Sequence, residues 1–240
     1  QLYSMPLVFR SYEEVDYVRQ RMDATLVKGL ADHGMAVLGI SDGGFAYIMS
    51  DKPLRTLGDL KGHKVWTPEG DVLTGAMFES AGISPIPLPV ADVYTGLQTG
   101  LLDTVAGIPT GIIAFQWYTS VTHLTDVPLM FLSGMLTIDS KAFGRIKPGD
   151  QAIVRSIMGD IFSKLDEVNR ADNESARAAL QNQGIEFVHP DAAQRDNWET
   201  IAKQGREQLI RRAKYTPALV ETMLGHIQEY RSRHGSGDSE

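Results

Sequence analysis

Hydrophobic residues near the beginning of the sequence recur at steps of three and four. This spacing places them on one face and predicts a helix over 12–32, with Ser11 as its N-cap. The apolar positions of that face are Tyr12, Val15, Val18, Met22, Leu26 and Leu30. Two apolar runs follow and predict buried strands at 35–40 and 45–49, separated by a turn at Asp42-Gly43-Gly44.

Short apolar runs and short helical segments then alternate as far as residue 118. Predicted strands occupy 64–66, 86–88 and 104–108, and predicted helices occupy 72–81, 91–99 and 111–118. Gly82 and Gly100 end the first two helices. Alternation on this scale is typical of βα units, so we expect an α/β fold with a mostly parallel sheet.

The pattern changes near residue 130. A long strand is predicted over 130–138, followed by a helix over 150–183 that Gly184 closes. Such a helix would be roughly 50 Å long, which indicates that it spans two lobes. The apolar stripe of this helix consists of Ile153, Ile157, Ile161, Leu165 and Val168. A strand at 185–188 and helices at 191–212 and 217–232 complete the pattern, and we expect a disordered polar tail at 235–240.

Composition narrows the class of protein. The chain has 23 basic and 30 acidic residues and a net charge of −7, which makes nucleic acid a poor candidate partner. It contains no cysteine, so disulfides, thiolate metal sites and a cysteine nucleophile are excluded. Neither a membrane-spanning run nor a signal peptide is evident, and a chain that opens on Gln1 is expected to be a processed form or a fragment.

Motifs for catalysis or cofactor binding are missing. The sequence has no GxSxG, GxxxxGK[ST] or GxGxxG pattern, and no two of its six histidines have the spacing of metal ligands. We interpret each histidine as a surface or turn residue. We therefore expect no catalytic residue, no metal and no cofactor.

One pair of carboxylates could carry acid/base chemistry. Glu69 and Asp71 lie in the loop after the 64–66 strand and before a helix, at the edge of an α/β sheet where ligands bind. The alternative is that Asp71 is only the N-cap of the helix that starts at Val72 and that Glu69 lies in the loop. We favour the cap, and we keep the loop as a candidate site.

Four segments resemble one family. Residues 50–65 (SDKPLRTLGDLKGHKV) resemble KPIRTPxDLKGxK, and residues 93–103 (VYTGLQTGLLD) resemble VYTALQTGxVD. Residues 7–14 (LVFRSYEE) resemble LPFLFxSYEE, and parts of 138–153 resemble the segment that opens the family's long helix. These motifs are those of the substrate-binding proteins of TRAP (tripartite ATP-independent periplasmic) transporters.

The resemblance implies a two-lobed periplasmic binding fold with hinge strands and a long helix bracing both lobes. It assigns residues 1–44 to the remainder of lobe I, 45–131 to lobe II, and 132–240 to a hinge strand, the long helix and the C-terminal helices that complete lobe I. It also implies that a first βαβα block of the family fold is absent from this chain. We expect unpaired strand edges and exposed apolar surface where that block would lie.

The pocket that the resemblance implies departs from the family at four positions. Trp66 stands where most members have a carboxylate-binding arginine, and Ala46 stands where a second arginine is frequent. Gly107 replaces the usual ligand-binding asparagine, and Val90 replaces a common pocket phenylalanine. A bidentate arginine is a strong carboxylate ligand. Its loss leads us to expect a ligand larger and more apolar than a C4-dicarboxylate, in a divergent branch of the family.

The expected function is capture of a small organic solute between two lobes and its delivery to a TRAP membrane permease, outside the cytoplasm, without catalysis. The alternatives are an acid/base enzyme that uses Glu69 and Asp71, and a ligand-binding receptor for a sensor. A tetratricopeptide-repeat protein is a further expected partner. We expect ten residues to bind the ligand: Phe45, Tyr47, Trp66, Thr67, Glu69, Asp71, Val90, Gly107, Pro109 and Thr110. Within Gln116-Trp117-Tyr118, the two aromatic residues are interpreted as packing instead.

Overall fold

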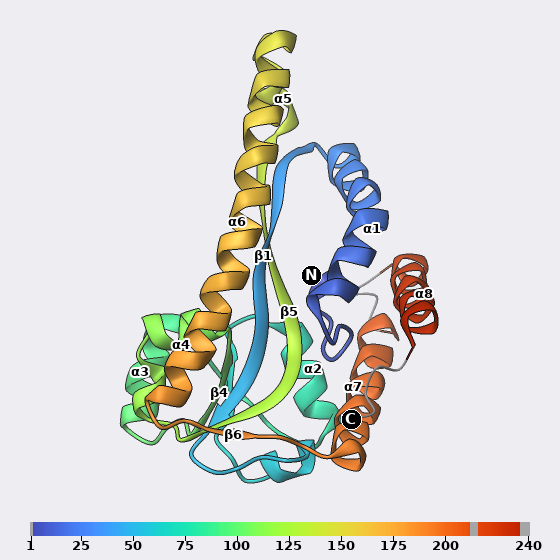
Figure 1. Cartoon of the computed structure of the whole chain (residues 1–240). Coiled ribbons are helices and arrows are strands. Elements are labelled where there is room, and N and C mark those ends of the chain that lie inside the picture. Colours follow the sequence, from blue (N-terminus) through green and yellow to red (C-terminus); the bar gives the residue numbers. More distant parts are fainter. Residues whose placement is uncertain (1, 212–215, 236–240) are drawn as a thin grey trace. The chain divides into compact units, whose positions relative to one another are not determined.

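The computed structural model describes residues 2–211 and 216–235 (Figure 1). The longer elements are α1 (Tyr12–Asp32), β1 (Met35–Ser50), β5 (His123–Asp139), α6 (Pro148–Asn182), α7 (Ala192–Arg211) and α8 (Pro217–His234). The shorter ones are β2 (Trp66–Pro68), α2 (Val72–Ser80), β3 (Ile86–Leu88), α3 (Val90–Gln98), β4 (Thr104–Gly107), α4 (Pro109–Ala114), α5 (Ser140–Phe143) and β6 (Glu186–Val188). Short 3-10 turns are η1 (Leu2–Ser4), η2 (Leu57–Leu60) and η3 (Trp117–Thr119).

Most predicted elements are present within a few residues, but the long strand expected over 130–138 already begins at His123, and one further prediction about strands and one about a helix were wrong. The two strands expected at 35–40 and 45–49 form one strand, β1, which runs through Asp42-Gly43-Gly44 without a turn. Gly44 has a φ of 115°, so the strand continues through a conformation that favours glycine. The predicted helix over 111–118 ends at Ala114, because Gln116 is left-handed with a φ of 58°.

The sheet is mixed, which corrects the expectation of a mostly parallel one. Its order is β4-β1-β5-β6, and β2 pairs with β3 in a separate two-stranded sheet. β1 is antiparallel to β4, whereas β5–β6 and β2–β3 are parallel. The long strands β1 and β5 also run antiparallel, since Ser140 N–H donates to Gly34 O at one end and Thr122 N–H donates to Ser50 O at the other. Antiparallel strands can pair without a helical crossover between them. The alternation of strands and helices along the sequence did not reveal this pairing of β1 with β5.

Backbone contacts divide the chain into two units. Unit 1 comprises residues 1–8, 44–132 and 171–216, and unit 2 comprises 9–43, 133–170 and 217–240. The predicted breaks after residues 44 and 131 lie beside these divisions, whereas residues 171–216, expected with the first segment, cluster with 44–132. Residues of β1, β5 and α6 belong to both units. The assignment to lobes I and II stays a prediction.

Unit 1 has an apolar core. Trp198 on α7 is 1% exposed, and its indole Nε1 donates to Arg55 O at 2.8 Å. α7 lies side by side with α2 (Figure 1). A Cβ at Gly205 would meet Met77 Cα at 3.1 Å, so glycine permits this close approach. The buried core consists of Ile48, Leu54, Leu57, Leu60, Val65, Met77, Phe78, Ile83, Leu129 and Trp198.

Unit 2 is organised around a buried carboxylate, Asp42, which has no exposed surface. Arg19 Nη1 and Arg170 Nη2 both donate to it, and Asn169 Nδ2 donates to its backbone oxygen at 2.7 Å. Burial raises the pKa of Asp42, an effect that the two guanidinium groups oppose. The second carboxylate in the set is Asp166, which accepts from Asp42 N–H at 2.7 Å and from Arg19 at 3.0 Å. These paired charges join α1, β1 and α6 within unit 2.

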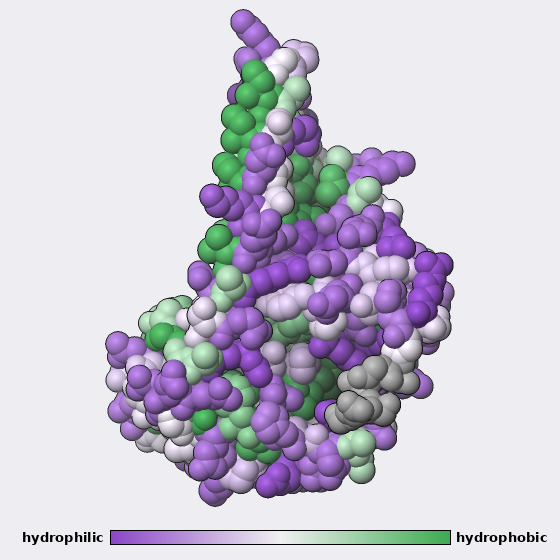
Figure 2. All heavy atoms as spheres, in the orientation of Figure 1, coloured by the Kyte–Doolittle hydropathy of each residue, from purple (hydrophilic) through white to green (hydrophobic). Residues whose placement is uncertain are grey.

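The apolar stripe of α6 lies on the surface of unit 2. Figure 2 shows a row of hydrophobic side chains along this helix. Ile153, Ile157 and Ile161 are each at least half exposed, and Leu165 and Val168 are 38% and 44% exposed. Exposed apolar surface was expected where a further block of the family fold would lie, and whether the stripe marks that place stays a prediction. The expected disorder at 235–240 falls mostly outside the described residues.

Candidate functional site

An apolar cavity of about 310 Å³ lies within unit 1. Residues of β1, β2, α2, α3, β4, α4, η3 and β5 line it. Among the described lining residues, the only one with an ionisable side chain is Asp71, and none is a lysine, arginine or histidine. Its volume is at the lower end of the range of known small-molecule pockets. Shape and lining therefore suit a small, mainly apolar molecule.

The cavity brings together four residues at which the sequence departs from the family's ligand anchors. These are Ala46 on β1, Trp66 on β2, Val90 at the start of α3 and Gly107 at the end of β4. They are separated by up to 61 positions in the sequence, from Ala46 to Gly107. Three of them, Trp66, Val90 and Gly107, are predicted ligand residues. The residues that the sequence singled out as departures from the family therefore lie around one cavity.

Two indoles form one wall of the cavity. The rings of Trp66 and Trp117 meet edge to face with centroids 5.1 Å apart, and Phe115 stacks on Trp117 at 5.4 Å. Trp66 Nε1 donates to Leu88 O at 2.9 Å, which fixes this ring against β3. Trp117 is 3% exposed, and its Nε1 has no hydrogen-bond partner among the described residues. Phe115 is half exposed, so the wall extends to the surface.

Gly107 lies beside this wall. A Cβ at this position would lie 3.0 Å from Ile112 Cδ1 and 3.5 Å from Trp117 Cζ3. The distance to Ile112 Cδ1 is tight, so a side chain at position 107 would require this flexible group to shift slightly, whereas the distance to Trp117 is that of ordinary van der Waals contact.

Asp71 is the N-cap of α2, as the sequence favoured. Its Oδ1 accepts from Thr74 N–H at 3.3 Å, and its Oδ2 accepts from the Thr74 hydroxyl at 2.5 Å. Asp71 is half-buried and lines the cavity, whereas Glu69 is exposed and does not. The two carboxylates therefore do not face the cavity together, which removes the geometry that an acid/base pair on one substrate needs.

The other predicted ligand residues lie outside the cavity lining. Phe45 packs edge to face on Phe131 at 5.4 Å. The Tyr47 ring lies under the Arg177 guanidinium at 4.7 Å. Burial lowers the pKa of Arg177, but the charges of Tyr47 and Asp126 and the hydrogen bond to Asp126 outweigh it, so the pKa is raised.

The last three predicted residues are placed as follows. Thr67 is buried, and its hydroxyl has no hydrogen-bond partner among the described residues. Pro109 is the buried first residue of α4. Thr110 Oγ1 donates to Asn173 Oδ1 at 3.1 Å. These placements do not test ligand binding, so the roles of all three stay predictions.

The sequence interpretation missed Phe115 and Trp117 as cavity residues. Residues 116–118 were interpreted as packing, and Phe115 was not considered. The available signal was their position, because an aromatic cluster directly after the strand that ends at Gly107 lies at the carboxyl end of that strand, where α/β sheets bind ligands. Trp117 does pack on its neighbours, but it also lines the cavity.

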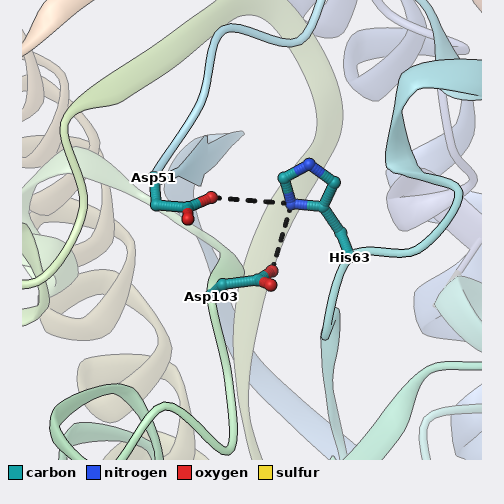
Figure 3. Close-up of side chains that lie close together, drawn as sticks. All are labelled: Asp51, His63 and Asp103. Carbon is teal, nitrogen blue, oxygen red and sulfur yellow. Dashed lines mark hydrogen bonds and ion pairs between the residues drawn. The ribbon is translucent and has the colours of Figure 1, made fainter.

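Three side chains with metal-ligand atoms converge elsewhere in unit 1 (Figure 3). His63 Nδ1 lies 3.1 Å from Asp103 Oδ1 and 3.7 Å from Asp51 Oδ1. The Asp103 oxygen also accepts from Lys64 N–H at 2.9 Å and from the Thr104 hydroxyl at 2.8 Å. An oxygen with three protein donors serves to tie loops together, so we interpret the cluster as structural. The His63 side chain is 11% exposed, and the residue closes a turn through the hydrogen bond from its N–H to Leu60 O at 3.0 Å, so it is a half-buried turn histidine.

Comparison with known proteins places the chain in a family. The sequence model of the bacterial extracellular solute-binding protein family 7 (DctP) matches residues 1–212 of the 240. The C4-dicarboxylate-binding periplasmic protein DctP of Rhodobacter capsulatus is 25% identical over 215 residues, which cover 88% of this chain and 64% of that protein. The chain belongs to this family of extracellular solute-binding proteins. It spans less than two thirds of the length of this relative.

Solved structures show the same fold. The ectoine-binding protein of the TeaABC TRAP transporter from Halomonas elongata matches with a TM-score of 0.86 at 18% identity, over 95% of this chain and 76% of that one. A TRAP solute-binding protein from Shewanella oneidensis with bound succinate matches with a TM-score of 0.85 at 17% identity, over 95% and 74%. The two-lobed α/β fold of TRAP periplasmic binding proteins is therefore confirmed as the fold class of this chain.

Proposed function

We propose that the protein captures a small organic solute in the cavity of unit 1, for a TRAP-type secondary transporter. One observation carries the proposal: Ala46, Trp66, Val90 and Gly107, chosen from the sequence as departures from the family's ligand anchors, line one cavity. A family of solute-binding proteins is expected to retain a binding cavity while changing the residues that choose the solute.

The ligand that this cavity suits is more apolar than a C4-dicarboxylate. The matched relatives are described as binding C4-dicarboxylates, ectoine and succinate. In this chain an indole occupies the position of the family arginine, and the lining offers ring and aliphatic surface. Burying apolar ligand surface there contributes about 25 cal/mol per Å². Stacking against Trp66, Trp117 and Phe115 adds about 0.5–1.5 kcal/mol for an aromatic ligand.

Delivery of the solute to membrane permease subunits, outside the cytoplasm, completes the proposal. The relatives named above are periplasmic proteins, which supports this location. None of the helices in the described ranges 2–211 and 216–235 is long and apolar enough to cross a membrane. A tetratricopeptide-repeat partner finds no support in the comparisons and is not proposed.

We propose no catalysis. The family is one of transport proteins, and the acid/base alternative required Glu69 and Asp71 to act on the same substrate. Glu69 is exposed outside the cavity, and Thr74 occupies both oxygens of Asp71. The receptor alternative would use the same binding cavity and differs only in the partner, so the experiment below addresses the binding step that both share.

Native mass spectrometry of protein purified gently from a bacterial periplasm tests this proposal. We expect a small organic compound to co-purify with the wild type and to be lost from Trp66→Arg, because a guanidinium would fill and charge the cavity. Trp198→Phe is the matched control, since it also removes an indole but lies in the core rather than in the cavity. Retention of the compound by Trp66→Arg would place its site elsewhere and contradict the proposal.

A further inference from the structure

The charges around the cavity are unlike those of a carboxylate site. No described lining residue is a cation, and the single ionisable side chain is the carboxyl of Asp71. Burying a carboxylate without a cation costs several kcal/mol, because the lost hydration is not replaced. A carboxylate ligand in this cavity would also be repelled by Asp71 across a medium of low effective dielectric constant.

Asp71 also occupies the place in which an anion would otherwise bind. The N-terminus of a helix attracts anions through its free N–H groups and its dipole. At the start of α2 the chain supplies this anion itself, since Asp71 Oδ1 accepts from Thr74 N–H at 3.3 Å and Oδ2 accepts from the Thr74 hydroxyl. The second helix that begins beside the cavity, α4, has Thr110 N–H directed to Asn173 Oδ1 at 3.4 Å.

The remaining donors of the wall are neutral. Trp117 Nε1 is buried and lacks a partner among the described residues, and an unsatisfied buried donor costs about 1–3 kcal/mol. α3 begins at Val90 without a side-chain cap, and its Asp92 N–H is already paired, since it donates to Pro89 O at 3.0 Å. An uncharged acceptor such as a carbonyl oxygen can pair with donors of this kind without a counter-ion.

We propose that the cavity admits its ligand as a neutral molecule and that Asp71 is the specificity-determining residue that excludes carboxylates. This inference rests on the proposed function, because it concerns the same cavity. It assigns the protein to neutral ligands with an apolar, preferably aromatic, body and an uncharged polar group, although the family's usual pocket clamps organic acids. Asp71 acts through its charge, and its capping of α2 is a separate structural role.

Two probes of nearly equal shape separate charge from size: benzamide, which is neutral, and benzoate, which is an anion. Affinity for each is measured by isothermal titration calorimetry and by the change in tryptophan fluorescence, since two of the three tryptophans line the cavity. We expect the wild type to bind benzamide at least about 100-fold more tightly than benzoate, because burying a carboxylate without a cation costs several kcal/mol.

Asp71→Asn isolates the charge of Asp71. Asparagine caps a helix about as well as aspartate, so the variant keeps α2 while it removes the negative charge. We expect it to bind benzoate roughly tenfold more tightly than the wild type does and benzamide about equally. Glu69→Gln removes the same charge from the exposed neighbour outside the cavity and is expected to change neither affinity.

Each outcome decides one of the two proposals. The exclusion of carboxylates is supported if the wild type binds benzamide more tightly than benzoate, if Asp71→Asn reduces this ratio of affinities, and if Glu69→Gln leaves the ratio unchanged. Equal or tighter binding of benzoate by the wild type overturns it and leaves solute capture by the cavity intact. If Asp71→Asn keeps the wild-type ratio of affinities for benzamide and benzoate, Asp71 is not the residue that excludes carboxylates. Binding of neither probe would overturn the assignment of the cavity as the binding site, and with it the proposed function.

Discussion

The two units of the molecule share the elements β1, β5 and α6 but differ in the polar groups that are buried within them. Unit 1 has a core of ten buried hydrophobic residues around Trp198. Unit 2 is centred on Asp42, a carboxylate with no exposed surface that two arginines bind. The described residues that line the cavity of unit 1 include no cation. In unit 2, Arg19 and Arg170 pair with the carboxylates of Asp42, Asp166 and Asp16. Arg19 and Arg170 thus join elements of unit 2, and we propose that the cavity of unit 1 selects its ligand by shape and polarity.

The largest loss of stability is expected when a side chain in the core of unit 1 is truncated. Trp198→Ala removes a side chain that is 1% exposed and the donor to Arg55 O, so we expect the free energy of unfolding to fall by about 3–5 kcal/mol. Hydrogen exchange measured by peptide should accelerate in residues 54–65 and 72–83 and stay unchanged in 12–32. Equal acceleration of exchange in both regions would contradict the expectation that the effect of this substitution is confined to unit 1.

A smaller loss is expected from the charge network of unit 2. Asp42→Asn leaves Arg19 and Arg170 without their shared buried carboxylate and should cost about 3 kcal/mol. Both arginines keep other carboxylate partners, Asp166 and Asp16, which limits the loss. The same peptide measurement should now show faster exchange in 12–32 and an unchanged core of unit 1. Asp160→Asn, on the exposed surface of α6, is the control for loss of one negative charge.

The smallest effect concerns acid stability in unit 1. Burial raises the pKa of Asp59, but backbone N–H bonds from Thr56 and Arg55 at 2.8 Å outweigh it, so the pKa lies below its usual value of 3.8. The stability that ionised Asp59 contributes is present above pH 3.8 and is lost as the pH falls through the folded-state pKa. Asp59→Asn should therefore make stability, measured by urea unfolding, less steeply dependent on pH below this value. An unchanged slope would contradict the assignment.

Much of the fold could be predicted because its signals are local. Helical periodicity and a closing glycine were sufficient for α6, which begins and ends within two residues of its prediction. The continuity of β1 was missed for a long-range reason. Asp42-Gly43-Gly44 has the composition of a turn, but Asp42 lies inside a strand, where it contacts side chains that are distant in sequence, Arg19, Asp166, Asn169 and Arg170. The tertiary contacts overrode a local propensity.

The candidate site was predictable to the extent that it lies at the ends of strands. Trp66, Asp71, Val90 and Gly107 were selected from strand ends, helix starts and departures from the family motifs, and all four line the cavity. Trp117 was missed, because an aromatic residue lines a cavity only where neighbouring side chains leave one side of its ring uncovered. That property depends on residues that are distant in sequence, such as Trp66, whose ring packs edge to face on Trp117.

A crystal structure of the protein with its co-purified compound would test the central claim most directly. We predict that the compound lies in the cavity of unit 1, with its apolar body against Trp66 and Trp117 and with no carboxylate facing Asp71. A compound bound beside His63, or along the exposed stripe of α6, would contradict the assignment of the cavity. A carboxylate within the cavity would contradict the selection of neutral ligands.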